Sequence, residues 1–339
     1  MLFRRAAAPL FALLFAALAA GCGGSSTEAP GRGAGESEAG PPRRSVKLLL
    51  NWFPEAEHGG YYAALVNGGF ARAGLDVAIQ PGGPGTPVAQ QVALGQFEFG
   101  ILNADGVIQA RSEEAPLVCV FAPLQTSPRC IMVHKKSGIT EFGQIRNMTL
   151  AMSSSQPFAL FLRKRFPLEG VQIVPYPGNV VQFLRDENFA QQGYVFSEPF
   201  VAESQGGDPH VLMVSDLGFN PYTSCLVCTE DLIRKEPELV RAFVAACAAG
   251  WKEYLASPGA VHEHIHKINP EMSREVLDYG AKALAPLVRG SGKTPIGIMV
   301  KARWVTLLEQ LVEIGEAKPG MIDVEDLFTT AFLPHELAP

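Results

Sequence analysis

The sequence predicts an α/β protein with two lobes. From Val46 onward, short apolar strands alternate with amphipathic helices and short loops, the pattern of a sheet covered by helices. The pattern occurs twice, over 46–122 and over 130–217, and a mainly helical stretch follows. The roughly 295 residues of this region exceed one typical hydrophobic core, so we expect two lobes.

The first block alternates strands with helices. Its strands are expected at 46–50, 75–80, 97–102 and 117–122, and its helices at 61–73, 87–94 and 106–111. This alternation predicts parallel strands joined by right-handed crossovers. Ligands bind beyond the carboxyl ends of such strands, which here are Asn51-Trp52, Gly82 to Thr86 and Asn103-Ala104-Asp105.

The second block is expected to contain strands at 130–134, 149–152, 172–175 and 193–196. Ser153-Ser154-Ser155-Gln156 precedes a predicted helix at 157–166, and its hydroxyls are suited to the free N–H groups of a helix start. Helices are then expected at 231–255, 273–287 and 300–314. We expect this helical tail to return to the first lobe.

The N-terminal region has the features of an export signal. Arg4 and Arg5 precede an uncharged run over 6–20 that is too short to span a bilayer comfortably. The run ends in Leu18-Ala19-Ala20-Gly21-Cys22, which resembles the lipobox of bacterial lipoproteins. We expect a signal peptide over 1–21 and lipidation of the Cys22 thiol, with a plain secretory signal as the alternative.

The stretch that follows Cys22 is rich in Gly, Ser, Pro and Glu and offers almost nothing apolar to bury. Such a composition predicts a flexible tether over 22–44. The protein is therefore expected to be exported and held by a lipid anchor on the extracytoplasmic face of the cell membrane or outer membrane.

Composition and cysteine content exclude some functions. A net charge of −6 argues against a nucleic-acid partner, which would need a basic face. Besides Cys22, the five cysteines form no dense disulfide framework, although one disulfide in an exported protein stays open. Cys225 and Cys228 lie three apart on an apolar strand and face opposite sides, so we interpret them as small core residues. The five are Cys119, Cys130, Cys225, Cys228 and Cys247.

Several motifs in order resemble one protein family. They are Leu50-Asn51-Trp52-Phe53-Pro54, His58-Gly59-Gly60-Tyr61-Tyr62, Gly95-Gln96-Phe97-Glu98-Phe99-Gly100-Ile101, Gly193-Tyr194-Val195-Phe196-Ser197-Glu198-Pro199, Gly297-Ile298-Met299 with Trp304, and Phe332-Leu333-Pro334. Together they resemble ABC-transporter substrate-binding proteins of the sulfonate/thiamine-pyrimidine-precursor type, which are homologous to the yeast thiamine-pyrimidine synthase. The resemblance covers nearly all of 46–334.

The resemblance implies a type II periplasmic-binding-protein fold, in which two α/β lobes joined by a two-stranded hinge close around a ligand. The lobes are then expected at 45–125 with 222–339 and at 126–221, and the hinge segments at 125–129 and 219–223. We expect a monomer that delivers its ligand to an ABC permease.

The ligand implied by the resemblance is a thiamine pyrimidine precursor, such as a hydroxymethyl- or formylamino-pyrimidine. The loop Pro81-Gly82-Gly83-Pro84-Gly85 and the segment Gln125-Thr126-Ser127-Pro128 also resemble a riboflavin-binding branch. Riboflavin is therefore the first alternative ligand, with sulfonates and nitrate behind it. An anion site would need more hydroxyls, N–H groups or Arg, so Trp52 and Glu198 argue against an anion.

A flat heteroaromatic ligand needs an aromatic face and a few fixed hydrogen-bonding groups. The resemblance places Trp52 against the ligand ring, with Asn51 beside it and Tyr194 and Glu198 on the second lobe. The Glu198 carboxylate is expected to accept from a ligand amino group. Packing, turn formation and helix capping are the alternative roles of Trp52, Asn51 and Glu198. The other expected site residues are His58, Tyr61, Gly83, Gly85, Asn103, Asp105 and Ser154.

Two patterns point toward catalysis or metal binding. The related enzyme uses a histidine near the position of His58, but its Cys-Cys-Cys-Phe-Cys segment is absent here. His262-Glu263-His264-Ile265-His266 satisfies H-E-x-x-H, yet it lies between Pro258 and Pro270 with no third ligand indicated. We interpret it as an exposed helix and expect no catalytic activity, cofactor or metal site.

Overall fold

The computed structural model describes residues 43–290 and 295–334. The predicted signal peptide, Cys22 and the tether up to residue 42 lie outside the described residues. Across the described ranges, every helix is too short or too polar to cross a membrane.

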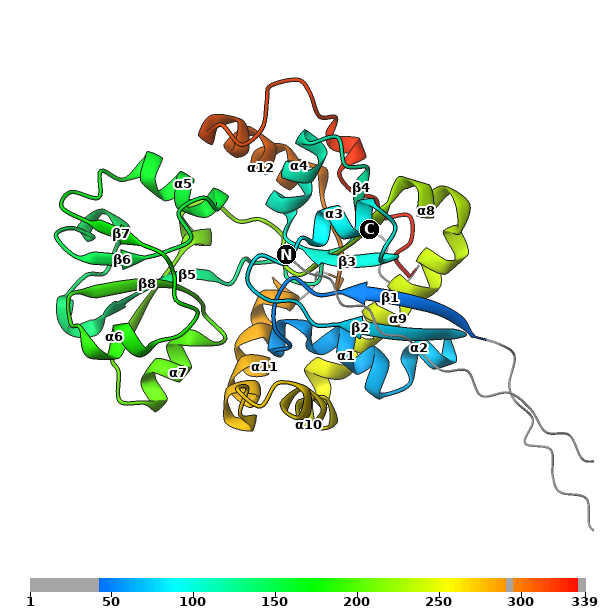
Figure 1. Ribbon diagram of the computed structural model, residues 1–339, viewed down its shortest axis with the longest axis horizontal. Coiled ribbons are helices and arrows are strands. Elements are labelled where there is room, and N and C mark those ends of the chain that lie inside the picture. The colour runs from blue at the N-terminus through cyan, green and yellow to red at the C-terminus, as the bar shows by residue number, and fades with distance from the viewer. Residues whose placement is uncertain (1–42, 291–294, 335–339) are drawn as a thin grey trace, which may run out of the picture. The chain divides into compact units, whose positions relative to one another are not determined.

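The described chain forms two five-stranded sheets with helices, which confirms the predicted α/β class with two lobes (Figure 1). The first sheet has the order β2-β1-β3-β10-β4, and the second has the order β7-β6-β8-β5-β9. The strands are β1 (Arg44–Leu49), β2 (Leu75–Gln80), β3 (Phe99–Leu102), β4 (Leu117–Phe121), β5 (Arg129–His134), β6 (Thr149–Ala151), β7 (Gln172–Val174), β8 (Phe189–Tyr194), β9 (Pro209–Met213) and β10 (Cys225–Thr229).

The helices cover these sheets. In Figure 1, α5, α6 and α7 gather around the green strands of the second sheet. The α-helices are α1 (Gly59–Val66), α2 (Gly69–Arg72), α3 (Val88–Ala93), α4 (Ala104–Ser112), α5 (Pro157–Arg165), α6 (Val181–Arg185), α7 (Glu198–Ser204), α8 (Glu230–Lys235), α9 (Pro237–Ala256), α10 (Gly259–Ile268), α11 (Arg274–Arg289) and α12 (Lys301–Ile314). Short 3₁₀ turns are η1 (Ala56–His58), η2 (Lys135–Ser137), η3 (Phe142–Gln144), η4 (Val214–Leu217) and η5 (Val324–Asp326).

Both sheets are mixed, so the expectation of parallel pairing is only partly correct. Strand β1 runs parallel to β2 and β3, and β6 runs parallel to β7 and β8. Strand β10 is antiparallel to β3 and β4, and β5 is antiparallel to β8 and β9. The parallel rule applies to strands joined by a helix within one sheet. Because β5 and β10 each arrive from the other sheet, no such helix fixes their direction.

Several element boundaries differ from prediction, and three of the differences have a local cause. The helix expected over 61–73 is divided at Gly68, whose φ of +72° suits glycine. The helix expected over 231–255 is divided before Pro237, which has no N–H to donate to the preceding turn. The strand expected over 193–196 begins earlier and forms β8 (Phe189–Tyr194). The prediction missed its first residues because Gln191 and Gln192 are buried but polar, and polar residues are typical of a loop.

Helix α1 packs closely against α9, and this packing fixes the N-terminal end of α1, which follows the aromatic loop. A Cβ atom on Gly59 would overlap the ring of Tyr254, and one on Gly60 would overlap the ring of Trp251. Glycine is therefore required at both positions for the two helices to meet. This contact anchors η1 and the loop before it to the core of the first sheet.

Two crossover segments connect the sheets, one between β4 and β5 and one between η4 and β10. They pair with each other through an antiparallel bridge between Leu124 and Thr223. This arrangement is the two-stranded hinge that the predicted fold requires. The residue boundaries proposed for the hinge and the lobes stay predictions.

Arg303 of α12 holds both crossover segments. Its guanidinium donates to the carbonyl of Gln125 and, over 2.9 Å, to the carbonyl of Asn220. It also donates to Asn220 Oδ1 over 3.0 Å, and that oxygen accepts from the backbone N–H of Ser127 over 2.7 Å. The guanidinium carbon lies 3.8 Å from the ring centroid of Tyr222. One side chain thus ties the outgoing and returning chains to the same helix.

The helical tail packs more widely than expected. Helix α12 contacts α4, which belongs to the first sheet, and α5, which covers the second. Lys164 of α5 donates to the carbonyl of Glu313 of α12. Helix α11 also reaches the second sheet, because the ring of Tyr279 stacks on Phe200 at 4.5 Å. The tail therefore packs on elements of both sheets.

The five cysteines of the described residues are buried thiols. Cys225 belongs to the apolar cluster around Trp304, and Cys228 belongs to the cluster around Trp251. The two side chains thus face opposite sides of β10. Their predicted role as core residues is confirmed.

We predict that Arg303→Met destabilises the protein by about 2–3 kcal/mol, because carbonyls of both crossover segments lose a charged donor. Urea unfolding monitored by circular dichroism measures this change. Arg163→Met, at an exposed position of α5, is the matched control and should change the free energy of unfolding little. Equal stability of Arg303→Met and the wild type would contradict the clamping role.

Candidate functional site

Side chains from the two sheets meet in one hydrogen-bonded group. Asn103, which caps α4 on the first sheet, donates through Nδ2 to Tyr194 Oη over 3.3 Å. Arg129, which begins β5 of the second sheet, donates through Nη2 to the same oxygen over 3.1 Å. The predicted residues Asn103 and Tyr194 are therefore brought together, and Arg129 joins them.

The Arg129 guanidinium is held between two aromatic rings. Its central carbon lies 4.2 Å from the ring centroid of Tyr194 and 4.7 Å from that of Phe158. Burial raises the pKa of Tyr194, although Arg129 lowers it. The phenol therefore stays neutral near pH 7 and keeps its own hydrogen for donation.

Glu198 is fixed by two donors from the second sheet. The backbone N–H of Tyr194 donates to Oε2 over 2.8 Å, and the Tyr176 hydroxyl donates to Oε1 over 2.5 Å. The carboxylate is thus held at the start of α7, and each oxygen keeps a further lone pair. Its predicted contact with a ligand amino group stays a prediction.

A second group lies in the loop after β1. Asn51 Oδ1 lies 3.0 Å from Nε2 of His58, and Glu57 Oε1 lies 3.2 Å from the same nitrogen. Because the Asn51 oxygen can only accept, Nε2 carries a hydrogen. The side chains of Glu57 and His58 are both fully buried. Sequence analysis predicted Asn51 and His58 but not Glu57.

Three acidic side chains are buried in or beside the site. Glu55, Glu57 and Asp105 are 6%, 0% and 8% exposed. Burial, followed by the charges of Glu57 and Glu198, raises the pKa of Glu55 well above its ordinary value, while Arg129 lowers it. Burial also raises the pKa of Asp105, against the Gly106 N–H and Arg129. Arg129 thus faces several carboxyl groups.

Ser224 connects these groups from β10. Its N–H donates to Asn103 Oδ1 over 3.3 Å, its carbonyl accepts from the Tyr61 hydroxyl over 2.6 Å, and its hydroxyl donates to the Glu57 carbonyl over 3.2 Å. Its φ of +56° is strained for a serine. The hydrogen bonds hold the residue in this conformation.

The remaining predicted residues occupy varied positions. Trp52 is half-buried, and its ring contacts Phe53 edge-on at 5.5 Å. The N–H of Gly82 donates to the Trp52 carbonyl over 3.0 Å, so the glycine-rich loop lies beside this aromatic residue. In that loop Gly83 packs against the Phe53 ring.

Three predicted residues are not joined to the central hydrogen-bonded group through their own side chains. Tyr61 is fully buried in the core and reaches the group only through Ser224. Gly85 lies in an exposed turn with a φ of +77°. Ser154 is also exposed, and the N-cap of α5 is Gln156 rather than a serine.

Sequence reasoning missed Glu55, Glu57, Arg129, Tyr176 and Ser224. The alternation of Glu55 and Glu57 with apolar residues was the available signal, since both acids lie directly before the buried His58-Gly59-Gly60 run. An acidic loop residue is ordinarily exposed, so only the tertiary packing of η1 shows that these two are buried.

The H-E-x-x-H segment lies on α10 and is less exposed than expected. His262 is fully buried, with Nδ1 2.7 Å from Asp278 Oδ1 and Nε2 3.1 Å from the Tyr254 hydroxyl. His266 Nδ1 lies 2.9 Å from the Met272 carbonyl. Both histidines are therefore used in packing contacts, and the interpretation of an exposed helix is wrong at His262.

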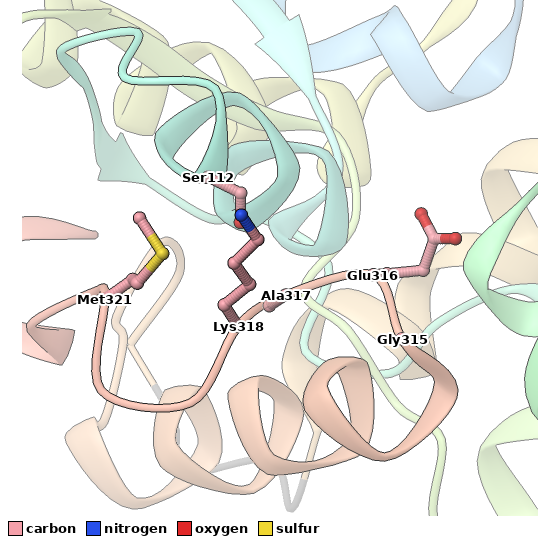
Figure 2. A pocket seen from close by; sticks show the side chains of 6 residues that line it. All are labelled: Ser112, Gly315, Glu316, Ala317, Lys318 and Met321. Carbon is pink, nitrogen blue, oxygen red and sulfur yellow. The ribbon is translucent and has the colours of Figure 1, made fainter.

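One small pocket lies elsewhere, between the end of α4 and the loop after α12 (Figure 2). Its volume of about 130 Å³ is below the several hundred Å³ of ligand pockets. Figure 2 shows the Lys318 amine near Ser112 and the Glu316 carboxylate turned away. The lining residues are Ser112, Gly315, Glu316, Ala317, Lys318 and Met321.

Comparison with known proteins identifies relatives of two kinds. The chain is 23% identical over 311 residues to the riboflavin-binding protein RibY of Chloroflexus aurantiacus, covering 87% of this chain and 88% of RibY. A segment of 89 residues is 36% identical to the formylaminopyrimidine-binding protein of Halalkalibacterium halodurans, covering 26% and 27% of the two chains. The 4-amino-5-hydroxymethyl-2-methylpyrimidine phosphate synthase THI11 of Saccharomyces cerevisiae is 23% identical, covering 68% and 73%.

The fold has many solved neighbours. The periplasmic aliphatic sulfonate-binding protein SsuA of Escherichia coli superposes with a TM-score of 0.64 at 16% identity, covering 84% of this chain and 91% of SsuA. This likeness confirms the predicted periplasmic-binding-protein fold. The family model described as NMT1/THI5 like matches residues 55–261, which is more than half of the chain. The chain therefore belongs to the NMT1/THI5-like family.

Proposed function

We propose that this protein is the solute-binding component of an ABC importer and binds a thiamine pyrimidine precursor where the two sheets meet. The observation that supports this proposal is the group formed by Asn103, Arg129 and Tyr194, to which both sheets contribute. Separation of the sheets would break the bond between Asn103 and Tyr194, so a ligand seated there would favour the closed arrangement.

The charges of the site favour a heterocycle with N–H donors over an anion. The site contains the acids Glu55, Glu57, Asp105 and Glu198 but one guanidinium, Arg129, which already donates to Tyr194. A sulfonate or nitrate would meet repulsion from those acids that are ionised. The amino group and ring nitrogens of an aminopyrimidine instead offer hydrogen bonds that carboxylate and amide oxygens can accept.

Riboflavin is the second candidate ligand. RibY matches the chain over nearly its whole length, whereas the formylaminopyrimidine-binding protein matches over 89 residues. A flavin ring would also have an aromatic face available at Trp52. Riboflavin has a larger ring system than a pyrimidine and needs a larger binding site.

We propose binding without catalysis, although some relatives are named as synthases. The absence of the enzyme branch's cysteine-rich segment from the sequence supports this proposal. Export and lipid anchoring at Cys22 are proposed from the lipobox, and they would place the protein beside a membrane permease.

The function is tested by native mass spectrometry of the isolated protein followed by calorimetry with a ligand panel. We expect a bound pyrimidine, or tight binding of 4-amino-5-hydroxymethyl-2-methylpyrimidine or its formylamino relative. Riboflavin, taurine and nitrate should bind more weakly. Preferential binding of riboflavin would replace the proposed ligand, and formation of a pyrimidine product after addition of iron and a vitamin B6 phosphate would replace the binding function with catalysis.

We predict that Trp52→Ala weakens ligand binding by roughly 1–3 kcal/mol, because stacking and buried apolar area are lost. Trp52→Phe keeps an aromatic face and should retain most of the affinity. Isothermal titration calorimetry compares the variants, and thermal unfolding checks that both are folded. Unchanged affinity in Trp52→Ala would exclude stacking on this residue.

A further prediction concerns stability and pH. Because the pKa of Glu55 is raised on folding, the native state binds more protons than the unfolded state above the ordinary value of 4.5. Stability therefore falls as pH rises from about 5 toward the raised pKa. Glu55→Gln should weaken this fall and exceed the wild type in free energy of unfolding at pH 8. Urea unfolding from pH 5 to pH 8 measures it, and identical pH profiles would contradict burial of an ionisable Glu55.

A further inference from the structure

We propose that Glu57 is the counter-ion of the ligand, so that the site binds a planar amidinium-type edge, a positively charged N–C–N group with two N–H donors. This inference rests on the proposed function and extends it, because a protonated aminopyrimidine presents such an edge. Neither the family pattern nor the motifs of the sequence assign a role to Glu57.

The first observation is the state of the Glu57 side chain. It is fully buried, and within the described residues neither of its oxygens has a hydrogen-bond partner. A buried carboxylate without hydrogen bonds is costly, since it has lost its hydrogen bonds to water and makes none within the protein. Both oxygens remain available, as bidentate recognition of two parallel N–H donors requires.

The second observation is the position of Glu57 at the meeting point of the sheets. It is adjacent to Asn51 and His58 in the loop after β1. Its backbone carbonyl accepts from the Ser224 hydroxyl over 3.2 Å, and the Ser224 N–H donates to Asn103 Oδ1 over 3.3 Å. Glu57 is thus joined through Ser224 to the group of residues that carries the proposed binding site.

Among the described residues, no neighbouring group donates a hydrogen bond to the Glu57 carboxyl group. His58 Nε2 is nearest at 3.2 Å, but it is 3.0 Å from Asn51 Oδ1, and His58 Nδ1 has no partner among the described residues. Arg129 is engaged by Tyr194, and the other titratable groups that face the site from η1 and the neighbouring elements are Glu55, Asp105, Tyr176, Glu198 and Tyr254.

A metal ion is a poor alternative occupant. In the described part of the chain, no three His, Cys, Asp or Glu side chains converge closely enough to hold one. The nearby aromatic residues Trp52 and Tyr194 are suited to a flat organic cation. A cation that combines a ring with an amidinium edge satisfies both features.

The inference is tested with benzamidine, which keeps its amidinium charge across neutral pH, and with benzamide as its neutral counterpart of the same shape. Calorimetry on the wild type should show benzamidine binding at least about tenfold more tightly than benzamide. Glu57→Gln should weaken benzamidine binding about ten- to hundredfold and leave benzamide unchanged, as expected for loss of a charge-assisted contact. Glu187→Gln, at an exposed acid of the second sheet, is the matched control and should bind like the wild type.

The uptake of a proton when an aminopyrimidine binds to the wild-type protein is a second test of the inference. At a pH where the free ring is neutral, binding as a cation should take up about one proton, which titration in two buffers of different ionisation enthalpy measures. The affinity should rise as pH falls toward the pKa of the ring, whereas that for benzamidine should stay level between pH 6 and pH 8.

The outcomes separate this inference from the proposed function. Aminopyrimidine binding without proton uptake, or equal binding of benzamidine and benzamide, overturns the inference and leaves the importer function intact. Benzamidine binding that depends on Glu57, without any binding of pyrimidine precursors, supports the inference and overturns the proposed ligand. Failure of both probes to bind overturns the inference.

Discussion

The hydrogen bonds that Tyr194 accepts from Asn103 and Arg129 are the interaction on which the candidate site depends. They join the carboxyl end of β3 to the ends of β5 and β8, and they hold the phenol between an amide and a guanidinium. Arg129 and Tyr194 are paired within the second sheet, so the Arg129 bond holds the phenol in place, whereas the Asn103 bond exists only when the two sheets are together. Any change in the relation of the sheets therefore changes the site directly, as a solute-binding protein requires.

The surroundings of this contact limit how the sheets can separate. The crossover segments pair at Leu124 and Thr223, and Arg303 binds carbonyls of both segments. Helices α11 and α12 each touch elements of the second sheet. In the proposed function, motion about the hinge would break the contacts of these helices while keeping the paired segments, and the free energy of closure would then include α11 and α12 as well as the ligand.

The charges in the site determine which ligands are compatible with the fold. The same architecture serves a sulfonate-binding protein among the neighbours, yet this chain places buried carboxyl groups at the sheet ends. A fold accommodates opposite ligand charges because the loops at the strand ends, rather than the sheet, supply the polar groups. Glu55 and Glu57 occupy such a loop, and the packing of α1 on α9 holds it against the core.

The sequence alone determined the α/β class, most strands and helices, and the strand-end candidates Asn51 and Asn103, because hydrophobic periodicity and strand ends are local features. The candidates His58, Tyr194 and Glu198 came from the resemblance to the family. Three features were decided by tertiary structure: the directions of β5 and β10, the role of Arg303, and the burial of Glu55 and Glu57. Each depends on segments far apart in the chain, such as Arg303 with Gln125 or Glu57 with Ser224. The sequence does not distinguish a charged residue that is exposed to water from one that is buried between sheets. Burial of such a residue is decided by tertiary packing, which excludes water from it.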